Sequence, residues 1–211
     1  MSTSINKQET VEKCAEEARL FPLEEGIFSE YFSSPGRLLD LGCGIGRATR
    51  PLKDLGHHVV GVDFSSELVE QARKLHPDIE FNVGDVCALE FEDASFDHVL
   101  FSLNGLDRLY PMQKRMNALS EIHRVLRPGG TFIYSSHDRD MLFNPVLRRD
   151  MRIKYYDGPY HSEGSEDGDV VNYYGTPKNN LSQLRNAGFN GFVALPQEGV
   201  HWRFYVTWKK A

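Results

Sequence analysis

Three glycines at alternate positions, Gly42, Gly44 and Gly46, follow a short apolar run at residues 37–41. The run has the composition of a β-strand, and residues 47–55 have helical composition. Glycine adopts positive φ angles and lets a ligand approach the backbone closely, while the N-terminus of the following helix favours polar or anionic ligand groups. The spacing therefore predicts a strand–turn–helix site for a nucleotide-type cofactor.

The spacing of these glycines differs from that of a dinucleotide-binding turn. Such a turn reads G-x-G-x-x-G, whereas here the third glycine is Gly46 and the bulky Arg47 comes next. NAD and FAD are therefore the weaker candidates. Because glycine-rich turns also occur as purely structural turns, the neighbouring segments must support the interpretation.

The next two predicted strands both end near an acidic residue. Residues 57–62 lead to Asp63 and Phe64, and residues 79–83 lead to Gly84 and Asp85. An acid at the tip of the second strand can accept hydrogen bonds from both ribose hydroxyls, and Phe64 can face an adenine ring. The structural alternatives are a helix cap for Asp63, a core position for Phe64 and a turn for Asp85.

Strands and helices continue to alternate along the chain. The patterns predict a strand at residues 96–101, a helix at 112–126 and a strand at 131–136, with Arg127–Gly130 ending the helix. Alternation at this spacing implies a parallel, doubly wound α/β sheet.

Four motifs in this order resemble class I S-adenosylmethionine-dependent methyltransferases with a methyltransferase type 11/25-like domain: LLDLGCGIGR, GVDFSSELV, GDV with FEDASFDHVLF, and HRVLRPGGTF. The resemblance covers roughly residues 15–136. It implies a Rossmann-like, doubly wound seven-stranded sheet, mostly parallel with one antiparallel edge strand, and helices on both faces. It also implies S-adenosylmethionine as the cofactor and S-adenosylhomocysteine as its product.

The resemblance places the methionine end of the cofactor on the turn from Gly42 to Gly46, which includes Cys43 and Gly44. It also implies that Asp40 orders this loop and that Asp63 binds the ribose. We interpret Cys43 as a small residue in a tight turn, because the sequence implies no base that would activate it as a nucleophile.

The resemblance also assigns the adenine end of the cofactor. Phe64 and Val86 are expected to sandwich the adenine ring, and Asp85 is expected to hydrogen-bond it. The backbone around Ser102 and Leu103 is expected to meet the amino group.

Composition limits the class of protein. The 211 residues, 40% of them hydrophobic, are enough for a single domain spanning residues 1–211. The absence of a signal peptide or a membrane-length apolar run predicts a cytoplasmic protein with no membrane partner. The cysteines and histidines lack metal-ligand spacing, so no metal is expected.

The acceptor is predicted to be a small molecule. A net charge of −6 argues against a nucleic-acid partner. The loop after the fourth predicted strand, residues 102–105, lacks the Pro-Pro-aromatic signature of enzymes that methylate adenine or glutamine amino groups. No cysteine follows a proline in the sequence, as the family of cytosine C5 methyltransferases would require. The same loop also lacks the paired glutamates of arginine methyltransferases.

His137 is the candidate general base, since it follows the fifth predicted strand at the carboxyl edge of the sheet, where ligands collect. The alternative is a structural histidine bonded to a loop carbonyl. Asn104 and Asp107 are candidates for binding an acceptor hydroxyl or amine, or for capping a short helix. Tyr174 is a candidate acceptor contact within an aromatic set, which can line an apolar or cationic site or belong to the core: Tyr155, Tyr156, Tyr173, Tyr174 and Trp202.

Two further segments are expected to shape the site. Residues 5–32 predict one or two helices that cover the cofactor, or that only pack on the domain. Residues 138–176 predict an inserted hairpin or lid, with strands at 151–156 and 170–174 around an acidic loop at 161–169. Four acids of this loop are a weaker candidate for a metal site: Glu163, Glu166, Asp167 and Asp169.

The C-terminal segment completes the predicted sheet. A helix is expected at residues 181–187, followed by strands at 192–195 and 200–208.

The sequence thus favours an S-adenosylmethionine-dependent methyltransferase, monomeric or homodimeric, that methylates oxygen or nitrogen of a small molecule by in-line displacement. One alternative is a protein or RNA methyltransferase, for which a basic docking surface would come from Arg139, Arg148, Arg149, Arg152 and Lys154. The other is a non-catalytic protein that binds S-adenosylmethionine, or a protein that binds NAD.

Overall fold

The computed structural model describes residues 19–143, 153–165, 168–195 and 202–211. Of the predicted N-terminal cover, the described part contains helix α2 (Pro22–Tyr31). Residues 1–18 lie outside the described residues. No helix in the described part of the chain is long and apolar enough to cross a membrane.

Seven strands form the main sheet, in the order β3-β2-β1-β4-β5-β10-β9. Its first five strands are parallel: β1 (Arg37–Leu41), β2 (His58–Asp63), β3 (Glu80–Val83), β4 (Phe96–Phe101) and β5 (Leu126–Asp138). Strand β10 (Trp202–Lys209) runs antiparallel to both β5 and β9 (Phe189–Leu195). The predicted seven-stranded, mostly parallel sheet is confirmed. Its antiparallel strand, β10, is the second strand from one edge, and β9 is the strand at that edge.

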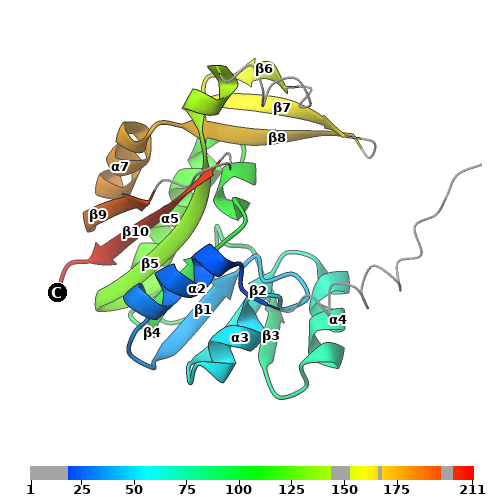
Figure 1. The fold of residues 1–211 in the computed structure, drawn as a ribbon, viewed down its shortest axis with the longest axis vertical. Coiled ribbons are helices and arrows are strands. Elements are labelled where there is room, and N and C mark those ends of the chain that lie inside the picture. The colour runs from blue at the N-terminus through cyan, green and yellow to red at the C-terminus, as the bar shows by residue number, and fades with distance from the viewer. Residues whose placement is uncertain (1–18, 144–152, 166–167, 196–201) are drawn as a thin grey trace, which may run out of the picture.

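Helices cover both faces of this sheet (Figure 1). On one face α2 and α3 (Thr49–Asp54) bury Phe28 and Leu52 against strand residues such as Leu38, and α4 (Ser66–Leu75) packs beside β2 and β3. On the other face α5 (Met112–Val125) and α7 (Pro177–Asn186) bury Ile122 and Leu184. The two cores hold the strand ends in fixed positions.

Local signals explain most helix starts. The Ser65 side chain accepts a hydrogen bond from the Leu68 backbone at 3.3 Å and caps α4. Helix α7 begins at Pro177, earlier than the predicted 181, because Thr176 and Asn179 form a capping box. Strand β5 begins at Leu126, earlier than the predicted 131, because Leu126 pairs with Phe96 of β4.

The inserted segment forms a small antiparallel sheet beyond the end of β5 (Figure 1). It contains β6 (Ile153–Asp157), β7 (Tyr160–Ser165) and β8 (Gly168–Gly175). Strand β8 also pairs in parallel with the last two residues of β5, which connects the small sheet to the main one. The prediction of a loop at 161–169 is wrong for most of its length, because backbone pairing between β7 and β8 outweighs the acidic, glycine-rich composition.

Candidate functional site

A cleft of about 560 Å³ opens at the carboxyl ends of β1, β2 and β4. Most of the residues predicted to bind the cofactor line it: Gly42, Gly44, Asp63, Phe64, Asp85, Val86, Ser102 and Leu103. Asp40, Cys43 and Gly46 are absent from the lining. The structure therefore brings three separate sequence motifs to one concave surface.

The three glycines of the turn have different local surroundings. Gly42, Gly44 and Gly46 all have positive φ angles, of 62°, 55° and 94°. A Cβ atom would lie 3.0 Å from the Phe101 ring at Gly42 and 2.8 Å from the His76 ring at Gly46, but would meet nothing within 4 Å at Gly44. Gly44 is therefore the glycine that leaves open space at the cleft, while the other two also permit close packing.

Asp63 joins the tip of β2 to the glycine turn. Its Oδ2 accepts a hydrogen bond from the Gly44 backbone and its Oδ1 accepts one from the Ser65 backbone, both at 2.9 Å. A carboxylate has about four acceptor positions, so each oxygen can accept one more hydrogen bond from a ligand hydroxyl. The neighbouring Phe64 side chain is 83% exposed, which leaves its ring available to a planar group in the cleft.

Asp40 and Cys43 lie behind the cleft surface. The Asp40 carboxylate is buried and accepts a hydrogen bond from the Thr49 hydroxyl at 2.6 Å, which ties β1 to the first residue of α3. Burial raises the pKa of Asp40 to about 7. Burial also raises the pKa of the Cys43 thiol, which disfavours the thiolate that nucleophilic catalysis requires.

A buried carboxylate on α2, which is not among the residues predicted from the sequence, links this helix to the cleft. Glu24 is fully buried, and both of its oxygens bind the Arg47 guanidinium, at 2.7 and 2.8 Å. Ser102, which lines the cleft, donates a hydrogen bond to Glu24 at 3.1 Å. The only local signal is the spacing of Glu24 after Phe21, whose backbone it caps. Its partners in the turn after β1 and in the loop after β4 are distant in sequence.

His137, at the end of β5, contacts two of the residues predicted to bind the acceptor. Its Nδ1 lies 2.8 Å from Oδ2 of Asp107, and its Nε2 lies 3.4 Å from Nδ2 of Asn104. Its ring packs against Tyr174 with a centroid distance of 4.9 Å. Asn104 and Leu103 both have positive φ angles, which is a strained conformation for residues other than glycine.

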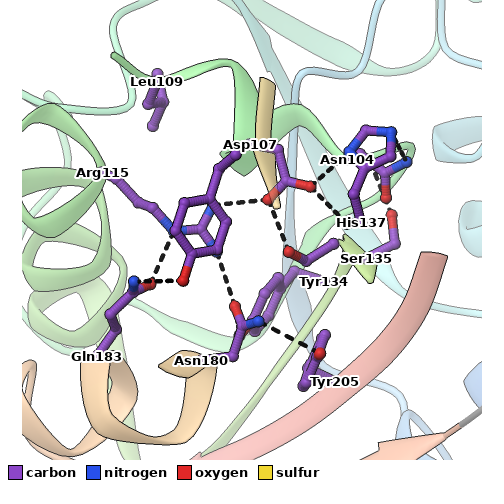
Figure 2. A network of polar contacts seen from close by, with 12 residues as sticks. Asn104, Asp107, Leu109, Arg115, Tyr134, Ser135, His137, Asn180, Gln183 and Tyr205 are labelled. Atoms are coloured by element: carbon purple, nitrogen blue, oxygen red, sulfur yellow. Dashed lines mark hydrogen bonds and ion pairs between the residues drawn. The ribbon is translucent and has the colours of Figure 1, made fainter. Parts of the chain in front are cut away.

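Asp107 is fully buried beneath His137 and does not line the cleft. Its Oδ1 accepts hydrogen bonds from the Arg115 guanidinium and the Ser136 hydroxyl, both at 2.8 Å. Figure 2 shows His137 and Arg115 on opposite sides of this carboxylate. The geometry therefore connects Asp107 to the imidazole of His137, a partner that its two sequence-based candidate roles, acceptor contact and helix cap, did not include.

The buried Arg115 extends the network toward α7. It donates hydrogen bonds to Asn180 at 2.9 Å and to Gln183 at 2.8 Å (Figure 2). Its guanidinium carbon also lies 4.0 Å from the centroid of the Tyr173 ring. Arg115 is not among the residues predicted from the sequence, because an arginine on a predicted helix is usually solvated. No local pattern signals its burial.

A second cavity, of about 570 Å³, lies beside the inserted sheet. Three of the predicted aromatic residues line it, namely Tyr155, Tyr173 and Tyr174, whereas Tyr156 and Trp202 do not. Because Tyr174 also packs on His137, this cavity adjoins the base candidate.

The weaker site hypotheses fall mostly outside the described part of the chain. No cluster of metal-ligating side chains occurs among the described residues. Glu166 and Asp167 lie outside that part, and the side chains of Glu163 and Asp169 are not described. Three residues of the predicted basic surface also lie outside the described part of the chain: Arg148, Arg149 and Arg152.

The order of the strands defines an α/β protein. Its cleft combines a glycine turn with an acid at the tip of the next strand, which is typical of a nucleotide-type cofactor site. Residues 38–130 match the family model described as a methyltransferase domain. Residues 38–130 are therefore similar to a methyltransferase domain, in agreement with the resemblance of the motifs to class I S-adenosylmethionine-dependent methyltransferases.

Known proteins support this assignment. Demethylmenaquinone methyltransferase of Renibacterium salmoninarum is 41% identical over 100 residues, which are 47% of this chain and 40% of that protein. Malonyl-[acyl-carrier protein] O-methyltransferase of Erwinia billingiae is 36% identical over 106 residues, 50% of this chain and 41% of that protein. These matches span less than half of either curated relative.

A solved structure matches nearly the whole chain. The crystal structure of a Pyrococcus horikoshii protein has a TM-score of 0.76 and 26% sequence identity. The match covers 99% of this chain and 94% of that one. The matched part of the chain therefore includes the inserted sheet.

Proposed function

We propose that this protein transfers a methyl group from S-adenosylmethionine to oxygen or nitrogen of a small-molecule acceptor. The main support for this proposal is the position of His137 between the cleft and the second cavity. It contacts Asn104, whose neighbour Leu103 lines the cofactor cleft, and Tyr174, which lines the second cavity. The curated relatives named above are called methyltransferases of demethylmenaquinone and malonyl-[acyl-carrier protein], which supports a metabolite acceptor.

The cleft residues fit S-adenosylmethionine in their chemistry. The open backbone at Gly44 suits the methionine end, Asp63 suits the ribose hydroxyls, and the exposed Phe64 ring suits the adenine. Asp85 and Val86 line the same cleft as Phe64. When bound, the cofactor supplies an electrophilic methyl group on a sulfonium.

The protein's own contribution is to hold the acceptor in line with that methyl group and to accept a proton. Positioning alone lowers the barrier of such a displacement substantially. The Asp107 carboxylate can only accept hydrogen bonds, so it places the proton of neutral His137 on Nδ1 and leaves Nε2 as the basic atom. Nε2 can then take the proton of an acceptor hydroxyl or amine. Asp107 is thereby a positioning residue rather than an acceptor ligand.

The proposal also covers the oligomeric state, the location and the partners of the enzyme. We infer a single domain that works as a monomer or homodimer in the cytoplasm, without a nucleic-acid or membrane partner. The net charge of −6 supports the absence of a nucleic-acid partner.

Ligand-dependent melting tests the cofactor part of this proposal. The melting temperature of the purified protein is measured with S-adenosylmethionine, S-adenosylhomocysteine, NAD or FAD, since a ligand that binds only the native state stabilises it. We expect a rise only with the two adenosyl sulfur compounds. A rise with NAD alone, or no rise with either sulfur compound, would refute the proposal.

A further inference from the structure

The second cavity has an unusual charge for this acidic protein. Among its lining residues are one arginine, Arg139, and no aspartate or glutamate. Arg139 forms no ion pair with any residue in the described part of the chain. The cavity thus offers an unpaired guanidinium in a chain with a net charge of −6, which favours an anionic ligand.

Aromatic rings form both the rim and the inner wall of this cavity. Phe143 and Tyr155 are each 70% exposed, while Tyr173 and Tyr174 are each 1% exposed. Exposed aromatic surface is unfavourable in water, and a planar ligand stacked on these rings would remove it from solvent. A volume of about 570 Å³ is large enough for a bicyclic ring system.

The inner wall of the cavity contacts the proposed base directly. Tyr174 and His137 are paired residues where β8 joins β5, and their ring centroids are 4.9 Å apart. Arg139 is the first residue of the 3-10 helix η2 (Arg139–Phe143), two residues after His137, and it lines the same cavity as Tyr174. A ligand in the cavity can therefore contact Arg139 while its reacting atom approaches His137.

We propose that this cavity is the acceptor site and that the acceptor is a planar aromatic acid carrying a hydroxyl group. This inference rests on the proposed methyltransferase function. The carboxylate pairs with Arg139, and the ring lies among the Tyr and Phe side chains. The hydroxyl oxygen gains the methyl group that the sulfonium sulfur loses, and the hydroxyl proton passes to Nε2 of His137. The products are an aryl methyl ether and S-adenosylhomocysteine.

Calorimetry with three bicyclic probes tests the ligand class. The anion 1-hydroxy-2-naphthoate, the neutral 2-naphthol and the cation 5-hydroxytryptamine are titrated into the full chain saturated with S-adenosylhomocysteine. We expect the naphthoate to bind about tenfold more tightly than the other two, the scale of one charge-assisted hydrogen-bond pair. Arg139→Gln should remove this preference and leave the affinity for 2-naphthol unchanged.

Arg185→Gln is the matched control, because Arg185 is an exposed arginine of α7 that does not line the cavity. It should leave all three affinities unchanged. Equal affinities for the three probes, an unaltered preference in Arg139→Gln, or no binding of any probe would overturn the proposal. S-adenosylhomocysteine binding is measured first and separately. Its failure counts against the methyltransferase function, while the naphthoate preference can still be measured on the protein without it.

Discussion

Oδ2 of Asp107 lies 2.8 Å from Nδ1 of His137 and 2.6 Å from the backbone nitrogen of the same residue. One carboxylate oxygen therefore orients both the main chain and the imidazole ring of His137. The other oxygen is occupied by Arg115 and Ser136. Because Asp107 is held from both sides, it fixes the ring orientation and tautomer of His137.

His137→Ala should lower turnover and leave cofactor affinity nearly unchanged. Removal of a general base costs about 10²- to 10⁴-fold in rate, whereas His137 does not line the cofactor cleft. Turnover is measured by S-adenosylhomocysteine release and affinity by calorimetry. His58→Ala, at an exposed position where β2 begins, is the control and should behave like the wild type. Unchanged turnover in His137→Ala would assign a purely structural role to this residue.

Asp107→Ala should destabilise the protein by about 3 to 5 kcal/mol, because it leaves the fully buried Arg115 without its ion-pair partner. Urea denaturation measures the change in the free energy of unfolding. The double variant Asp107→Ala/Arg115→Met should recover part of the loss, since it removes the unpaired charge as well. A double variant whose loss equals the sum of the two single losses would show that these residues do not interact energetically.

Asp63→Ala should weaken S-adenosylhomocysteine binding by about 1 to 3 kcal/mol, the usual range for hydrogen bonds to a charged group. The affinity is measured by calorimetry. Glu70→Ala is a suitable control, because Glu70 is an exposed carboxylate of α4 outside the cleft. Equal affinity in Asp63→Ala and the wild type would exclude the ribose contact.

Asp40→Asn should change how stability depends on pH. Burial raises the pKa of Asp40 from 3.8 to about 7 in the folded protein, so the folded state binds this proton more tightly than the unfolded state does. Its stabilising contribution is fully present below pH 3.8 and is lost as the pH rises through about 7.

The asparagine variant lacks this proton. Relative to the wild type, it should therefore gain stability as the pH rises from 3.8 to about 7, by an amount on the order of a few kcal/mol. Unfolding free energies of both proteins at several pH values provide the measurement. A difference between them that does not change with pH would show that Asp40 titrates normally.

The main sheet could be predicted because its signals are local. Each parallel strand is a short apolar run followed by a turn or cap, as at Ser65, and the alternation of strands and helices implies the layered arrangement. The inserted sheet was predicted less well. Strand β7 is stabilised by pairing with β8 rather than by its own composition, so its acidic, glycine-rich sequence suggested a loop.

Local sequence patterns are enough to locate the residues that line the cleft, because Gly44 follows β1, Asp63 ends β2, and parallel strands bring their carboxyl ends to one edge. The position of Asp107 between His137 and Arg115, by contrast, is visible only in the folded protein. That arrangement depends on side chains from the 3-10 helix η1 (Gly105–Arg108), β5 and α5, which meet in the protein interior. Burial and ion pairing between distant residues leave no local pattern in the sequence.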